Sequence, residues 1–121
     1  STLIILQKLS RRKRALEAAN WSMYKKQKVT QVLTRKYTSS DEEESVLFGE
    51  ATHKRRFQHR LQWESAELTQ VKEELDKIYS SSILEERYRN MLIPYVRGNK
   101  YYSQRTAPAK APQWAVKDSN I

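Results

Sequence analysis

The side chains best suited to acid–base or metal chemistry are few in this chain and poorly spaced for it. The two histidines, His53 and His59, are six residues apart, whereas a helical zinc pair needs i,i+4 spacing. The neighbouring carboxylates Glu73-Glu74 and Glu85-Glu86 diverge on a helix, so neither pair forms an acid–base dyad. We therefore predict no catalytic residue and no metal site, and we expect a protein that is not an enzyme.

Other signatures of a reactive site are also absent from the sequence. There is no cysteine, which excludes thiol catalysis, Cys-ligated zinc and a disulfide framework. Gly49 and Gly98 stand alone, so no glycine-rich loop is available to hold a phosphate group. We expect no cofactor and no small-molecule substrate.

Positive charge is the most informative feature of the sequence. The net charge is +9, and residues 1–36 hold ten Lys and Arg against one acid, Glu17. The remaining 85 residues are electroneutral, so the first third of the chain predicts contact with an anionic partner. A second basic run begins at His53. The predicted polyanion-binding residues are Arg11, Arg12, Lys13, Arg14, Lys25, Lys26, Lys28, Arg35, Lys36, Lys54, Arg55 and Arg56.

The sequence predicts that helices carry most of these basic residues. Leu9, Leu16 and Met23 recur every seven residues without an intervening Gly or Pro, which predicts one long basic helix over residues 1–37. Residues 38–50 predict an acidic polar linker, in which Ser40 and Glu43 form a capping box.

The strongest periodicity lies in residues 51–79, where two interleaved heptad series predict a helical seam of coiled-coil type. Glu64 is the one polar residue in this seam. The region 51–97 thus predicts a heptad helix followed by a short third helix over 83–93, which Pro94 ends. The predicted packing residues are Phe57, Leu61, Leu68, Val71, Leu75 and Ile78.

Residues 98–121 lack periodicity and predict an extended tail that binds a partner. Its aromatic residues Tyr101, Tyr102 and Trp114 are the predicted anchors. We favour grooves on a protein partner over stacking on nucleic-acid bases, because the tail carries few basic residues.

Composition points to an all-α, elongated architecture with little independent core. Hydrophobic residues make up 38% and charged residues 31% of the chain, and there are two glycines and three prolines. So few turn residues disfavour a sandwich or barrel, and no apolar run reaches the ~18 residues of a membrane span. We expect a larger partner to supply much of the stability.

Three classes of function fit these features. We favour an intracellular structural subunit of a ribonucleoprotein, such as an organellar, mitochondrial ribosome, because Lys and Arg neutralise phosphates. The alternative is a structural protein of an acidic, tubulin-like assembly: an axonemal microtubule-associated protein, or an accessory subunit of a mitochondrial respiratory or ATP synthase complex. A free coiled-coil adaptor ranks third, because three heptads with a Glu in the seam are marginal alone.

Overall fold

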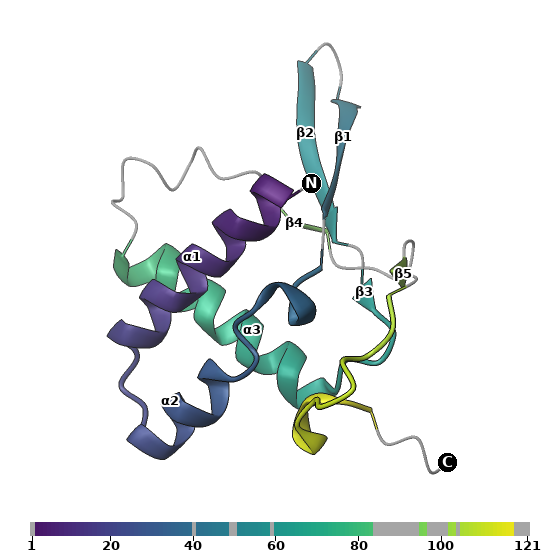
Figure 1. The fold of residues 1–121 in the computed structure, drawn as a ribbon. Coiled ribbons are helices and arrows are strands. Elements are labelled where there is room, and N and C mark those ends of the chain that lie inside the picture. Colours follow the sequence, from purple (N-terminus) through teal and green to yellow (C-terminus); the bar gives the residue numbers. More distant parts are fainter. Residues whose placement is uncertain are drawn as a thin grey trace.

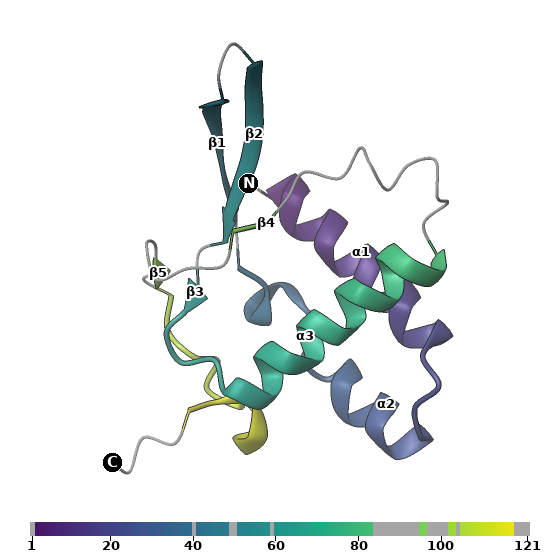
Figure 2. The same cartoon turned by 180° about the vertical axis from the view of Figure 1, so that it is seen from behind.

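The structure is a computed structural model that describes residues 2–39, 41–48, 51–58, 60–83, 95–96, 102–103 and 105–117. The helical elements are α1 (Thr2–Ala18), α2 (Met23–Thr30), α3 (Ala66–Ile78), the 3-10 turns η1 (Arg35–Tyr37) and η3 (Gln113–Ala115), and the π-helical turn η2 (Tyr79–Ile83). The strands are β1 (Asp41–Phe48), β2 (Ala51–Gln58), β3 (Arg60–Leu61), β4 (Tyr95–Val96) and β5 (Tyr102–Ser103). The packed part of the molecule is helical, as predicted, and a β-hairpin projects from it (Figures 1 and 2).

The predicted single helix over residues 1–37 is wrong, because the chain turns after Ala18 and starts again as α2. Ser22 caps α2, since its Oγ accepts a hydrogen bond from the Lys25 amide at 3.1 Å. Trp21, in the turn, is half-buried and packs on the apolar cluster between the helices. The break lets both pieces contact α3, which one straight helix of that length could not do (Figure 1).

The acidic linker and the start of the predicted heptad helix instead form the β1–β2 hairpin. The two strands pair antiparallel, from Asp41 opposite Gln58 to Phe48 opposite Ala51. Opposite charges on paired positions favour such a ladder, and the register places Glu43 opposite Arg56 and Glu44 opposite Arg55. The prediction of helix is therefore wrong for residues 51–58, and Phe57 lies in a strand.

The heptad pattern is confirmed where it overlaps α3. Ser65 caps this helix by accepting a hydrogen bond from the Leu68 amide at 3.0 Å. Leu68, Val71 and Leu75 are buried, and Leu61, just before the helix, is buried as well. The partners lie within the same chain. Val71 and Leu75 join the main cluster, with Ile78 packed at its edge, and Leu68 joins a second cluster with Val32, Tyr37 and Ala115. The other members of the main cluster are Ala15, Leu16, Val29 and Leu33.

The C-terminal segment 105–117 does not extend away from the body as predicted. The Ser65 amide donates to the Ala115 carbonyl at 3.1 Å, and the Lys117 amide donates to the Trp63 carbonyl at 2.8 Å. Trp114 is half-buried against both apolar clusters. Thus Trp114 is an anchor of the chain's own fold in this structure, and the segment closes one end of α3 (Figure 2).

The remaining predicted elements fall mostly outside the described residues. The predicted third helix begins at residue 83, the last residue of η2, and residues 84–94 are not described. Tyr101 also lies outside the described residues. Tyr102 belongs to β5, which pairs in parallel with β3.

Candidate polyanion-binding face

The first basic run, residues 11–14, divides into one buried and three more exposed side chains. Arg12 is 2% exposed, and its guanidinium makes a two-pronged contact with Asp76 of α3. Nε donates to Oδ1 at 2.9 Å and Nη2 donates to Oδ2 at 3.1 Å. The prediction that Arg12 binds an external polyanion is therefore wrong for this structure, because the residue joins α1 to α3.

Two of the three lysines of α2 face acidic side chains of α3. Lys28 Nζ lies 3.0 Å from Glu67, and Lys25 Nζ lies 3.7 Å from Glu74. Lys25 also sits over the Trp21 ring, 3.9 Å from its centroid. Such partly exposed pairs contribute little stability, but they neutralise part of the positive charge that the sequence places in the first 36 residues.

A second buried charge lies under this region, at Lys72. Its ammonium donates to the Tyr37 carbonyl and to Glu64, and Thr69 donates to the other Glu64 oxygen at 2.5 Å. Burial lowers the pKa of Lys72 from 10.5 to about 8, while Glu64 opposes that change. Glu64, the apparent defect in the heptad seam, is thus the partner of a buried cation.

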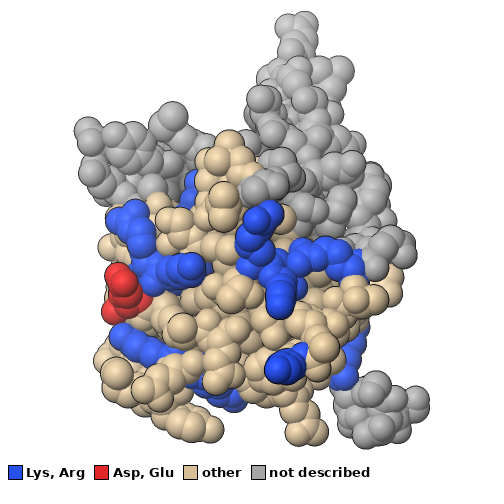
Figure 3. Space-filling model, in the orientation of Figure 1, with Lys and Arg blue, Asp and Glu red and all other residues tan. Residues whose placement is uncertain are grey.

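Lys26 donates to the Glu17 backbone carbonyl at 3.2 Å. Five other cations of the first 36 residues form no ion pair with any carboxylate that the structure describes. We call this set the basic face: Arg11, Lys13, Arg14, Arg35 and Lys36. Four of these side chains are exposed and Arg11 is half-buried. Lys and Arg side chains spread over α1 and η1 in Figure 3, and acidic atoms appear in one group at its left edge.

Two interactions hold the basic face in place. Arg11 and Arg14, one helical turn apart on α1, lie over the same Tyr79 ring, with Cζ at 5.8 and 5.7 Å from its centroid. Contact with the same aromatic ring favours both cations.

On the other side, Arg105 fixes η1. Its Nη1 donates to the Thr38 carbonyl and its Nη2 to the Arg35 carbonyl, both at 2.7 Å. The buried Lys8 ammonium donates to the Ser39 carbonyl at 2.9 Å, which joins α1 to the chain just after η1. These contacts set the position of the backbone that carries Arg35 and Lys36 next to α1.

The second basic run lies in strand β2. The register places Lys54, Arg55 and Arg56 opposite Ser45, Glu44 and Glu43 of β1. The predicted second polyanion site is therefore set beside an acidic strand, unlike the basic face on α1 and η1.

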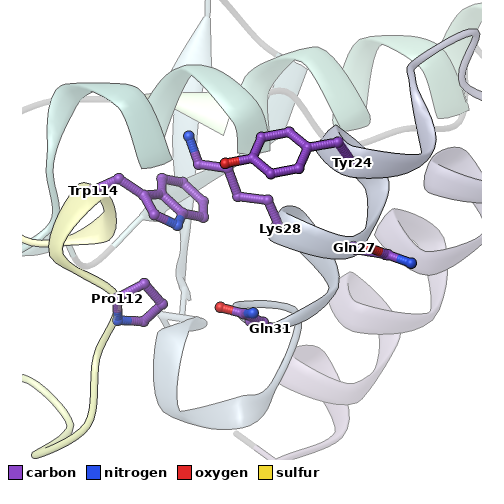
Figure 4. A pocket seen from close by; sticks show the side chains of 6 residues that line it. All are labelled: Tyr24, Gln27, Lys28, Gln31, Pro112 and Trp114. Atoms are coloured by element: carbon purple, nitrogen blue, oxygen red, sulfur yellow. The ribbon is translucent and has the colours of Figure 1, made fainter.

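A surface hollow of about 290 Å³ lies between α2 and the C-terminal segment. Tyr24 precedes Gln27 and Lys28 on α2 by three and four positions, which puts them on one helix face, and Gln31 is the C-cap residue of α2. Figure 4 shows the Tyr24 ring on one side, Trp114 and Pro112 on another, and the Gln31 amide opposite Tyr24. The lining residues are Tyr24, Gln27, Lys28, Gln31, Pro112 and Trp114. The spacing of the lining residues in and next to α2 could be seen in the sequence. Nothing in the sequence indicated that Pro112 and Trp114 pack beside them.

Within the described ranges no group of three or more His, Cys, Asp and Glu is placed to hold a metal ion. Among the helices that are described, none is long and apolar enough to cross a membrane. No protein-family model, no curated protein and no solved structure matches the chain.

Proposed function

We propose that this chain is a non-enzymatic interaction subunit that docks its basic face on the phosphate backbone of RNA within a ribonucleoprotein. The observation that carries the proposal is the difference between two sets of N-terminal cations. Arg12, Lys25 and Lys28 are paired with carboxylates of α3. The five residues of the basic face are not paired with any described carboxylate, so they remain available to an external anion.

The arrangement of the basic face suits contact with the RNA phosphate backbone rather than recognition of a specific base sequence. Lys and Arg that approach phosphates release condensed counterions, which gives affinity without base specificity. For single-stranded RNA, each neutralised phosphate contributes roughly −0.7 to the slope of log K against log salt concentration. If all five side chains of the basic face engage, the expected slope is about −3.5.

Fluorescence anisotropy of the full chain with a labelled RNA, measured across a range of salt concentrations, tests this proposal. We expect binding that weakens steeply with salt and follows that slope within about one unit. A chain that does not bind RNA near physiological ionic strength would contradict the proposal.

An acidic protein surface, such as a microtubule, is the second candidate, and one observation favours it. Leu3 and Leu6 at the start of α1 are 64% and 48% exposed, and Met23 at the start of α2 is 71% exposed. Apolar side chains beside cations suit contact with a protein surface, where interface cores are enriched in large apolar residues.

Co-sedimentation with microtubules, run in parallel with the RNA measurement, separates the two candidates. Retention on microtubules with no binding to RNA would favour an axonemal or similar structural protein. If the chain binds RNA and added microtubules do not displace the RNA, the ribonucleoprotein subunit is favoured.

A further inference from the structure

The hollow between α2 and η3 has the composition of a stacking site. Tyr24 is 79% exposed, so a large aromatic ring lies at the surface with most of its area in water. Trp114 and Pro112 form the facing wall (Figure 4). Nucleic-acid bases stack on such exposed aromatic rings, and the interaction tolerates any base because every base has a π-face.

Polar groups around the hollow match the rest of a nucleotide. Gln27 and Gln31 line it, and each amide offers both donors and an acceptor to a base edge. The Lys28 ammonium lies at the same hollow, 4.7 Å from the Trp114 ring centroid, and pairs with Glu67 at 3.0 Å. Lys28 therefore supports the aromatic wall, and the phosphates of a bound strand would contact the basic face.

The hollow lies close along the chain to one part of the basic face, the η1 turn. Gln31 precedes Arg35 by four residues, which separates their Cα atoms by at most about 14 Å. A strand whose phosphates lie along η1 could therefore place a base in the hollow within a few nucleotides. A duplex could not do so, because its bases are stacked and paired until one is extruded.

We propose that this hollow binds one base of a single-stranded nucleic acid whose phosphates lie on the basic face. This inference rests on the proposed function, and it narrows the ligand from nucleic acid in general to an unpaired strand. The two amides favour a base over a proline-rich peptide, because they offer donors and an acceptor to a base edge.

The test compares two labelled probes of equal length with the full chain: oligo(U) and the same backbone made entirely of abasic residues. We expect oligo(U) to bind about tenfold more tightly than the abasic strand. Tyr24→Ala should bring this ratio close to one without weakening the abasic probe, whereas Tyr24→Phe should keep it. Met23→Ala is the matched control, because Met23 is similarly exposed, at 71% against 79% for Tyr24, and does not line the hollow.

Each remaining outcome has a distinct meaning. Equal affinity for both probes overturns the base site and leaves the basic face intact, whereas failure of both probes to bind overturns the proposed function as well. Loss of affinity for both probes in Tyr24→Ala also overturns the base site. Equal affinity for both probes, with a proline-rich peptide that binds the wild type but not Tyr24→Ala, would identify the hollow as a peptide groove.

Discussion

Replacing Arg12 by Met should destabilise the fold and leave nucleic-acid binding almost unchanged. Arg12 is 2% exposed and donates twice to Asp76. Removing one partner of a buried ion pair typically costs about 3–5 kcal/mol, because the other charge is left without compensation. The Asp76 side chain is 31% exposed, so water can hydrate it in part, and we expect a cost near the lower limit of about 3 kcal/mol.

The assay is urea unfolding followed by circular dichroism, together with a thermal melt. For a chain of this length, about 3 kcal/mol corresponds to a fall in Tm of about 10 °C. Arg14→Gln is the matched comparison, because Arg14 belongs to the same basic run but is exposed. We expect it to change stability by less than about 0.5 kcal/mol and to weaken RNA binding.

Opposite behaviour of the two variants would refute the reasoning. If Arg12→Met unfolds at the wild-type urea concentration but binds RNA more weakly, then Arg12 faces an external ligand and not Asp76. Asp76→Asn gives an independent check, because it should also destabilise the fold and should lower stability less when Arg12→Met is already present.

Three further predictions concern the fold. The pKa of Lys72, lowered to about 8 by burial, means that the unfolded chain binds more protons than the folded chain between about pH 8 and 10.5. The contribution of Lys72 to the free energy of unfolding should therefore rise with pH across that window, by up to about 3 kcal/mol. Urea unfolding of the wild type and of the double variant Glu64→Gln/Lys72→Met measures this contribution. A difference in unfolding free energy between the two proteins that stays constant with pH would contradict the prediction. Ser65→Ala should cost about 1–2 kcal/mol, because Ser65 Oγ accepts from the Leu68 amide and donates to the Trp114 carbonyl at 2.6 Å. The exposed cap Ser22→Ala should cost about half as much in the same urea assay, and equal losses would show that the Trp114 contact adds nothing. The purified chain should show a cooperative loss of helix on heating, measured by circular dichroism, because Ala15, Leu68 and Leu75 are fully buried within the chain itself. A gradual melt would show that a partner must complete the fold, as the composition suggested.

Periodicity predicted the part of the fold that depends on apolar spacing. Leu68, Val71 and Leu75 are buried on one face of α3, as the heptads indicated. The same pattern continued through Phe57 and Leu61, but there the chain forms β2 and β3. Spacing alone could not show this, because the pairing of an acidic strand with a basic strand depends on residues outside the heptad positions.

The long N-terminal helix failed as a prediction for a related reason. No Gly or Pro marks the turn after Ala18, and the sequence signal is limited to Ser22 as a helix cap. Packing decides the outcome, since the turn places Val29 and Leu33 against Ala15 and Leu16. Contacts of this kind join residues that are distant in sequence, and a helical period does not report them.

Charge predicted the candidate face only in outline. Composition placed the positive excess in the first 36 residues but could not separate buried or paired cations from available ones. Arg12 and Arg14 have the same side chain and lie two residues apart, and only their positions on α1 distinguish them. Glu64 appeared to be a flaw in an apolar seam because its partner, Lys72, was not recognised as a buried residue.

The most direct measurement of the central claim is the salt dependence of RNA binding for two variants with the same net charge. Lys13→Gln/Arg14→Gln alters the basic face, whereas Lys77→Gln/Lys117→Gln removes two exposed cations elsewhere. We predict that the first variant loses roughly 1.4 from the slope of log K against log salt concentration and that the second keeps the wild-type slope. Equal losses in both variants would contradict the account, because binding would then follow net charge and not the face formed by α1 and η1.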